Sequence, residues 1–471
     1  MQGLDTAFFQ AESPTMPLHV IGALVLDPST ATGPWGFETV VELLGERIHL
    51  LPPFRWRAVP VPGDLDQPRW IEDPDFDLDR HMHRVSLPEP ADLGALADFV
   101  GKLAGVALDR SRPLWEMYVV EGMADGLVAL VTKLHHSFMD GGAGSEVMAS
   151  LFDLDPGGEP VDAPDEPWRP EDEPSPVRLL AEGAGGALAR AAKLPAVIAR
   201  TTLGFAGSAA SMLRSRTIPS LPVGPATPLN GSLTAERVVA FTRCSLAEVK
   251  RTKTALGVTV NDVMLAAAAT ALRAELLQRS ALPDRPLVAM VPISERATDE
   301  SEFTNRTAVL SVALPVQISD PVERLRAVRE LTLAAKERHR ARGDGVLEEW
   351  AALLPPLLIR AGARSYVSTG VARFVPPLFN VIVSNIPGPP IPLYLAGARV
   401  TRLYPMGPLF EGAGVNITLM SQGDAIDIGI MSCPSMLDDP DRLGRRFIDG
   451  LAELAEMADL HPVLGVDNDQ K

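Results

Sequence analysis

Cysteine is scarce in this chain of 471 residues, which contains only Cys244 and Cys433. Two cysteines so far apart argue against a disulfide framework and against a cysteine-based zinc site, and they fit a reducing compartment. Long apolar runs are also missing, because no stretch of 18 or more consecutive apolar residues occurs. A membrane-spanning helix is therefore not expected. The N-terminal segment carries Asp5 and Glu12 and no basic residue, which is not typical of a signal peptide.

Positive charge is in deficit as well. The chain has 43 Lys and Arg against 60 Asp and Glu, which gives a formal net charge of -17. Nucleic-acid binding requires a basic face that replaces counterions, so this class of partner is excluded. A lipid surface is not excluded, because net charge does not say where the charges lie.

The composition changes sharply near residue 153 and divides the chain into three parts. Residues 153–176 hold nine acids and seven prolines, which is typical of an extended surface linker. Residues 177–216 are basic and apolar, and we expect a helix interrupted at Pro195. This segment either lies on an anionic bilayer or is a crossover helix packed on its own protein. The expected organisation is an N-terminal domain over 1–152, this bridge over 153–216 and a C-terminal domain over 217–471.

Strand-like and helix-like patterns alternate in both large parts, which predicts an α/β fold. The pairs Ser245/Glu248 and Thr259/Asp262 have the spacing of helix N-caps, and Gly257 is placed to end the first of these helices. The last two predicted strands, joined by 421–424, have the spacing of a hairpin. The expected strands are the apolar runs at 127–134, 286–293, 379–385, 414–420 and 425–431.

The densest polar cluster is LHHSFMDGG at 134–142, where a predicted strand leads directly into His135 and His136. A histidine at a strand end is placed to project into a cleft, and its pKa suits proton transfer near neutrality. Gly141 and Gly142 permit a tight turn or a close approach to a ligand, and Asp140 can fix the local turn. A purely structural histidine pair is the alternative.

Other catalytic designs are less well supported. His81 and His83 could supply two metal ligands, but no third ligand has suitable spacing, so no metal site is predicted. No Gly-x-Ser-x-Gly elbow, Walker loop or strand-linked dinucleotide fingerprint occurs.

Several blocks of the sequence resemble a known family. HHSFMDG matches the HHxxxDG signature of CoA-dependent acyltransferases, which peptide-synthetase condensation domains share. More specific blocks are similar to the bacterial wax ester synthase/diacylglycerol acyltransferase family. They occur in the family's order and span nearly the whole chain outside the bridge: LDTAFFQAESPTMPLHV, PPFRWR, LDRSRPLWEMYVVEGM, TVNDVMLA, MVPIS, VSNIPGPP and GPLFEGAGVNITLMSQGD.

The resemblance implies two chloramphenicol-acetyltransferase-like subdomains with an active-site tunnel at their interface, entered by CoA from one mouth and by the lipid alcohol from another. His136 would be the general base, which takes the proton of the acceptor hydroxyl as its oxygen attacks the acyl-CoA thioester. Asn261 is the candidate oxyanion donor, with a helix-cap role as its alternative. His135 would shape the pocket or orient its neighbour, and Asp140 would hold an arginine as a scaffold residue.

Further candidates for substrate binding lie in the matching blocks, and each also has a packing interpretation. Trp115 is expected to be more a packing residue than a ligand contact, and Gly412 and Gly414 either let the backbone approach substrate or form a bend. The full set of these candidates is Gly141, Gly142, Trp115, Ser384, Asn385, Gly388, Gly412 and Gly414.

The resemblance predicts an acyl-CoA-dependent O-acyltransferase that forms triacylglycerol from diacylglycerol, with long-chain alcohols as further acceptors. Acyl-CoA is a co-substrate, and no cofactor is expected. The expected location is cytoplasmic, at the inner face of the plasma membrane or on lipid inclusions. Two alternatives remain: a condensation-type acyltransferase with a carrier-bound donor, and a non-catalytic paralogue that binds acyl chains or a membrane.

Overall fold

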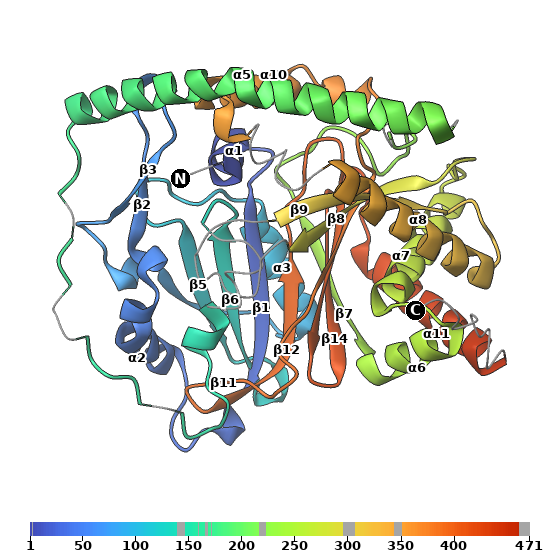
Figure 1. The fold of residues 1–471 in the computed structure, drawn as a ribbon. Coiled ribbons are helices and arrows are strands. Elements are labelled where there is room, and N and C mark those ends of the chain that lie inside the picture. The colour runs from blue at the N-terminus through green and yellow to red at the C-terminus, as the bar shows by residue number, and fades with distance from the viewer. Residues whose placement is uncertain are drawn as a thin grey trace, which may run out of the picture.

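Two six-stranded mixed sheets stand next to each other, and one long helix runs across both of them (Figure 1). This arrangement is seen in a computed structural model that describes residues 1, 3–138, 147–158, 160–164, 168–170, 172–215, 223–294, 307–342 and 351–460. The expected α/β architecture with two sheet-containing halves is confirmed.

The first sheet has the strand order β11-β12-β1-β6-β5-β4. Its side chains alternate between two cores, because successive residues of a strand point to opposite faces. On β6, Leu130 packs with helix α2, whereas Val131 packs with helix α3. The elements of this half are α1 (Gly3–Ala11), β1 (His19–Asp27), α2 (Phe37–Arg47), β4 (Met82–Ser86), α3 (Leu93–Ala104), β5 (Trp115–Glu121), β6 (Val128–His135), β11 (Tyr394–Leu395) and β12 (Ala398–Met406).

A small antiparallel pair, β2 (Trp56–Val59) and β3 (Arg69–Glu72), accompanies the first sheet. Between these two strands lies the short helix η4 (Pro62–Asp64).

The second sheet has the order β7-β14-β13-β10-β8-β9, and four helices of the described part of the chain pack against it. The predicted hairpin is confirmed: β13 and β14 pair as far as Gln422 and Ala425, and Gly423 supplies the positive φ of 54° in the turn. The elements of this half are β7 (Val238–Ser245), α6 (Leu246–Leu256), α7 (Val260–Gln278), β8 (Leu287–Ser294), β9 (Thr307–Leu314), α8 (Pro321–Arg342), α10 (Pro356–Ser368), β10 (Val381–Ile386), β13 (Val415–Gln422), β14 (Ala425–Ser432) and α11 (Pro440–Leu460).

The helix boundaries predicted from capping patterns are also confirmed. The Ser245 side chain accepts from the Glu248 N–H, and Gly257 ends α6 in the left-handed conformation. Thr259 and Asp262 form a reciprocal capping box at the start of α7.

The C-terminal half contributes two strands to the first sheet, which the sequence does not predict. β12 pairs antiparallel with β1, and β11 pairs with β12. Polar contacts tie β12 to the second sheet: the buried Asp427 carboxylate accepts from the Leu403 N–H at 2.8 Å, and Gln422 donates to the Val400 carbonyl at 3.1 Å. The two halves are therefore joined through shared strands, and not only through the bridge.

The bridge helix α5 (Pro176–Ser215) is continuous, so the interruption expected at Pro195 is wrong. Pro195 itself is exposed, and Val197 just beyond it is buried. Near its start, Leu179 is buried together with Val59 and Ile71. The Arg190 guanidinium pairs with Asp66 and donates to the Leu65 carbonyl at 3.0 Å. These contacts support the interpretation as a packed crossover helix.

Within the part of the chain that the structure describes, no helix taken alone has both the length and the apolar character needed to cross a bilayer. The pair α6 and α7 meets that criterion when joined, but a bend of 100° separates the two helices. The apolar face of α7 is buried in the protein core, from Val263 to Leu276.

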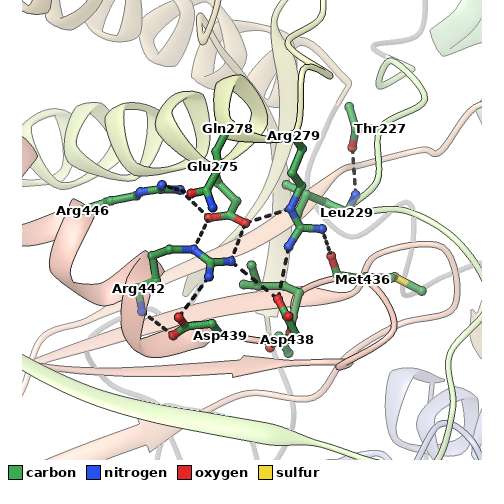
Figure 2. A network of polar contacts seen from close by, with 12 residues as sticks. Thr227, Leu229, Glu275, Gln278, Arg279, Met436, Asp438, Asp439, Arg442 and Arg446 are labelled. Carbon is green, nitrogen blue, oxygen red and sulfur yellow. Dashed lines mark hydrogen bonds and ion pairs between the residues drawn. The ribbon is translucent and has the colours of Figure 1, made fainter.

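A fully buried carboxylate joins α7 to α11. Glu275 is 0% exposed and accepts hydrogen bonds from three arginines (Figure 2). Arg442 donates two hydrogen bonds to the Glu275 carboxylate, at 3.1 and 3.0 Å. Arg279 donates a third at 2.8 Å, and Arg446 pairs with the same carboxylate. Burial alone would raise the pKa of Glu275, but the bonds from Arg442 and Arg279 outweigh it and lower this pKa.

Replacing this carboxylate by an amide should destabilise the C-terminal half. Breaking a fully buried ion pair costs about 3–5 kcal/mol, and because the three arginines are partly in water we expect Glu275→Gln to lower the free energy of unfolding by about 2 kcal/mol. Urea denaturation at neutral pH measures this difference. Glu248→Gln is the matched control, since Glu248 is 64% exposed and lies on α6.

The difference in stability between the wild type and Glu275→Gln should also depend on pH. The folded pKa of Glu275 lies below the ordinary 4.5, so its stabilisation is present above about pH 4.5 and is lost as the pH falls through the folded pKa. The difference between wild type and variant should therefore shrink in acid. Equal stabilities at pH 7 would contradict a stabilising role.

Candidate functional site

Strand β6 ends at His135, and the chain turns at once through residues 136–138. The backbone of both histidines is fixed by the flanking segments: the His135 N–H donates to the Leu114 carbonyl at 3.0 Å, and the His136 N–H donates to the Leu18 carbonyl at 2.8 Å. Because β6 lies between β1 and β5, the histidine pair is held at the end of an interior strand by the residues that directly precede its two neighbours.

His135 is fully buried, and both of its ring nitrogens face protein groups. Nδ1 accepts from the Ser137 N–H at 3.0 Å and lies 2.7 Å from the Ser137 hydroxyl. An accepting Nδ1 carries no proton, so the ring proton is on Nε2. Nε2 lies 3.1 Å from the Glu12 carboxylate. His135 is therefore oriented by its neighbours, and neither nitrogen is open to a substrate.

The partner of His135 is itself held by several donors. The side chain of Glu12 is 6% exposed. It accepts from Arg110 at 2.9 Å and from the Leu18 N–H at 3.2 Å, in addition to its contact with His135. Burial raises the pKa of Glu12, but the bond from His135 and the Arg110 charge outweigh it and lower this pKa to about 2. Glu12 is therefore ionised at any working pH.

The sequence did not single out Glu12 and Arg110 as site residues. Both lie inside blocks that carry the family resemblance, Glu12 in the first and Arg110 in LDRSRPLWE. Their position in these blocks was the available signal, but only the folded chain shows that the two side chains meet beside His135.

His136 has a different environment from His135. His136 is half-buried, and its ring stacks on that of Phe8 in α1, with the ring centroids 4.3 Å apart. The ring centroids of Phe8 and Phe410 are 6.4 Å apart, and those of Phe410 and Phe379 are 6.2 Å apart. Aromatic rings from three distant segments thus form a row that starts at His136.

The end of the HHxxxDG signature lies outside the described residues. Asp140, Gly141 and Gly142 belong to this part, so the scaffold role of Asp140 and the ligand approach at the two glycines stay predictions.

Asn261 occupies the first turn of α7 and is half-buried. The capping box beside it uses Thr259 and Asp262, so Asn261 is not needed as the helix cap. Among the described residues, no hydrogen bond links the Asn261 side chain to another group.

Ser384 and Asn385 lie on β10 where the second sheet opens. β10 pairs with β13 as far as Ile386, but its parallel pairing with β8 covers only Val381 and Ile382. Beyond Ile382 the two strands separate, so Ser384 and Asn385 have a strand partner on one side only, and both are half-buried. This geometry keeps both side chains as candidates for substrate contact.

The remaining candidates have protein contacts that account for them. Trp115 is fully buried, donates to the Phe54 carbonyl at 2.7 Å and stacks on His81 at 4.4 Å. A side chain at Gly388 would collide with the Ser421 backbone, and one at Gly414 would collide with Met436. Gly412 has a φ of 95° and forms a bend. These contacts support the packing interpretations, and a role in substrate binding stays a prediction.

His81 and His83 also take part in packing. His81 bonds through Nδ1 to the Trp115 carbonyl at 2.8 Å, and burial lowers its pKa. His83 stacks on Tyr118 with centroids 4.7 Å apart. Over the described ranges, no group of three or more His, Cys, Asp or Glu side chains is arranged to hold a metal ion.

Comparison with known proteins places this geometry in context. Residues 1–264 match the model of the wax ester synthase/diacylglycerol acyltransferase catalytic domain, and residues 303–455 match that of the WS/DGAT C-terminal domain. A putative diacylglycerol O-acyltransferase of Mycobacterium tuberculosis (strain ATCC 25618 / H37Rv) is 35% identical over 464 residues, covering 98% of this chain and 91% of the relative.

Solved structures agree with this comparison. The wax ester synthase/diacylglycerol acyltransferase from Marinobacter aquaeolei VT8 is similar with a TM-score of 0.68 and 26% identity, over 98% of this chain and 100% of that one. The starter condensation domain of rhizomide synthetase, in complex with C8-CoA and Leu-SNAC, has a TM-score of 0.55 at 15% identity over 99% and 96% of the two chains. At that identity the likeness concerns the fold alone.

The geometry around Glu12 generates a test. Glu12→Gln keeps the size of the side chain but removes the charge that holds His135, so the turn carrying His136 should lose its fixed position. Small misplacements of reacting groups cost up to about 100-fold in rate, and we expect the acyl-transfer rate to fall by about 10- to 100-fold. Initial rates at saturating acyl-CoA measure this loss.

Glu121→Gln is the matched control, because Glu121, at the end of β5, accepts a backbone N–H as Glu12 does, that of Phe37, at 2.8 Å. Its rate should stay close to that of the wild type. An unchanged rate in Glu12→Gln would show that the histidine pair does not depend on this carboxylate.

Proposed function

The chain belongs to the wax ester synthase/diacylglycerol acyltransferase family and is an acyl-CoA acyltransferase, and from this premise we propose that it esterifies diacylglycerol to triacylglycerol. Fatty alcohols, which would give wax esters, are the second class of acceptor. The proposal is supported by relatives named as putative diacylglycerol O-acyltransferases that match nearly the whole chain.

The contrast between the two adjacent histidines carries the mechanistic part of the proposal. His135 is buried with Ser137 and Glu12 at its two nitrogens, whereas the His136 residue is half-buried in the turn after β6. Stacking on Phe8 and the backbone bond to Leu18 restrict the positions of the His136 ring. We therefore assign the general base to His136 and an orienting role to His135.

The reaction then proceeds without an acyl-enzyme. His136 removes the proton of the acceptor hydroxyl while that oxygen attacks the thioester carbonyl carbon of acyl-CoA. The tetrahedral intermediate collapses as the carbon–sulfur bond breaks, which leaves the ester and the CoA thiolate. The thiolate takes the proton back from His136, so free CoA leaves and the histidine is restored.

The negative charge on the tetrahedral oxygen requires a hydrogen-bond donor. We assign this role to Asn261. Its amide is a donor at the N-terminal turn of α7, and the capping box of Thr259 and Asp262 leaves it unused as a cap. The positive end of the helix dipole favours an anion at the same place.

Two other functions fit the residues less well. A condensation-type enzyme shares the fold, but the family models and the relatives of matching length favour a lipid acceptor over a carrier-bound donor. A non-catalytic paralogue would not need an ionised Glu12 that aligns His135 beside a half-buried His136. Work at the inner face of the plasma membrane or on lipid inclusions is part of the proposal, because both substrates are lipids.

The proposed reaction can be measured directly. Purified protein supplied with radiolabelled long-chain acyl-CoA and diacylglycerol should form labelled triacylglycerol, separable by thin-layer chromatography. A parallel reaction with a long-chain alcohol should form a wax ester. If no acceptor in this panel yields an ester, the enzyme proposal fails.

Removal of the base should abolish most of the activity. Since general-base catalysis contributes about 10²–10⁴-fold, His136→Ala should lower the rate by at least 100-fold while the melting temperature stays close to that of the wild type. His49→Ala is the control, because His49 is also half-buried but lies in a short helix after α2. Near-normal activity in His136→Ala would reassign the base.

A further inference from the structure

One long segment of this acidic protein contains no acid at all. Residues 351–410 include neither Asp nor Glu, although acids make up more than one in eight residues of the chain. The basic residues in the same segment are Arg360, Arg364, Arg373, Arg399 and Arg402. The segment therefore has a positive charge opposite in sign to that of the whole chain.

Exposed apolar side chains gather in the first half of this segment, on α10 and the loop after it. Phe374 is 83% exposed, more than any other large apolar side chain that the structure describes, and Leu378 is 73% exposed. We define the 357–378 patch by its exposed members: Leu357, Leu358, Tyr366, Phe374, Val375 and Leu378. Clustered exposed apolar residues of this kind mark interaction surfaces.

Arginines border the patch. Arg364 and Arg373 are exposed, and Arg360 pairs with Asp64 of η4. The bridge helix α5 contacts the segment between β2 and β3, to which η4 belongs, through the ion pair of Arg190 with Asp66. On the same helix, Leu188 is 74% exposed. Figure 1 shows α5 and α10 along the same edge of the molecule. Cations and apolar groups, without acids of the segment itself, suit an anionic lipid surface better than a protein surface of mixed charge.

The patch is continuous with the row of aromatic rings at the site. α10 packs against α1, the helix that holds Phe8 against His136. Leu378, at the end of the patch, is followed directly by Phe379, which contacts Phe410 and through it Phe8. A continuous series of apolar side chains thus leads from the exposed patch to His136.

We propose that the 357–378 patch docks on an anionic lipid bilayer and that the lipid acceptor passes from there along the Phe379–Phe410–Phe8 row to His136. Apolar side chains enter the headgroup region, and the bordering arginines contact anionic headgroups. The docking surface follows from exposure and charge alone, whereas delivery of the acceptor rests on the proposed function.

Vesicle sedimentation of the full chain tests the docking. Wild-type protein should bind phosphatidylcholine vesicles containing phosphatidylglycerol more tightly than vesicles of phosphatidylcholine alone. Leu358→Ser/Phe374→Ser should reduce binding at least tenfold, and Arg364→Glu should reduce it by about fivefold or more, an effect that salt weakens. The control Val106→Ser/Leu154→Ser changes side chains that are 60% and 64% exposed on other elements and should bind like the wild type.

Equal binding by all variants would overturn the proposal. So would a change in the sedimentation coefficient of Leu358→Ser/Phe374→Ser without vesicles while vesicle binding stays intact, because the patch would then contact a second copy of the chain. Circular dichroism melting curves show whether each variant is folded.

Rates measured with two kinds of acceptor distinguish docking on the bilayer from the acyl-transfer reaction itself. Leu358→Ser/Phe374→Ser should lose most of its rate with diacylglycerol in vesicles and keep its rate with a short, water-soluble alcohol. A wild-type protein that binds vesicles but forms no ester would refute the proposed function and leave the docking surface intact. Equal losses with both acceptors would overturn the delivery route.

Discussion

The arrangement of the site depends on one buried carboxylate. An ionised group shielded from water is stable only when several donors surround it, and Glu12 has Arg110, the Leu18 N–H and His135. These donors come from the loop before β5, the start of β1 and the end of β6. The charge of Glu12 therefore forces three separate segments to meet beside the last residue of β6, and the position of His136 follows from that meeting. The interaction contributes a fixed geometry rather than a proton, since the pKa of Glu12 is about 2.

A second constraint fixes the C-terminal half of the chain relative to His136. β12 belongs to the first sheet by its pairing with β1, yet Asp427 and Gln422 of the second sheet bond to its backbone. The segment that follows β12 carries Phe410, which contacts Phe8 beside His136. Because one strand holds both sheets, groups from the C-terminal half keep a defined distance from His136. Two halves joined only through the bridge would have no such restraint.

The parts of the fold that follow from neighbouring residues could be predicted from the sequence. The turn of the β13–β14 hairpin and the caps at Ser245 and Thr259 depend on residues fewer than five positions apart, and the structure has them as expected. The pairing of β12 with β1 joins residues almost 400 positions apart, and no local pattern encodes it. Pro195 shows the opposite case, in which a local rule predicts a break but the helix continues through the proline.

The same distinction holds for the site. The histidine pair and Asn261 could be found from their motifs, because those motifs are contiguous. The role of Glu12 could not, because it depends on distances between residues 12, 110 and 135. The packing roles of Trp115, Gly388 and Gly414 also depend on neighbours distant in sequence, namely Phe54, Ser421 and Met436.

The distribution of charge explains how a protein with a net charge of -17 can approach an anionic bilayer. Screening at physiological ionic strength limits electrostatic interactions to about 8 Å, so only the charges closest to the lipid count. Nine of the acids lie in 153–176, whereas the segment that carries the 357–378 patch has none. Attraction can then act at the face with Arg364 and Arg373, although the chain as a whole is acidic. In the proposed orientation, this face lies on the bilayer and the row of aromatic rings leads from it to His136.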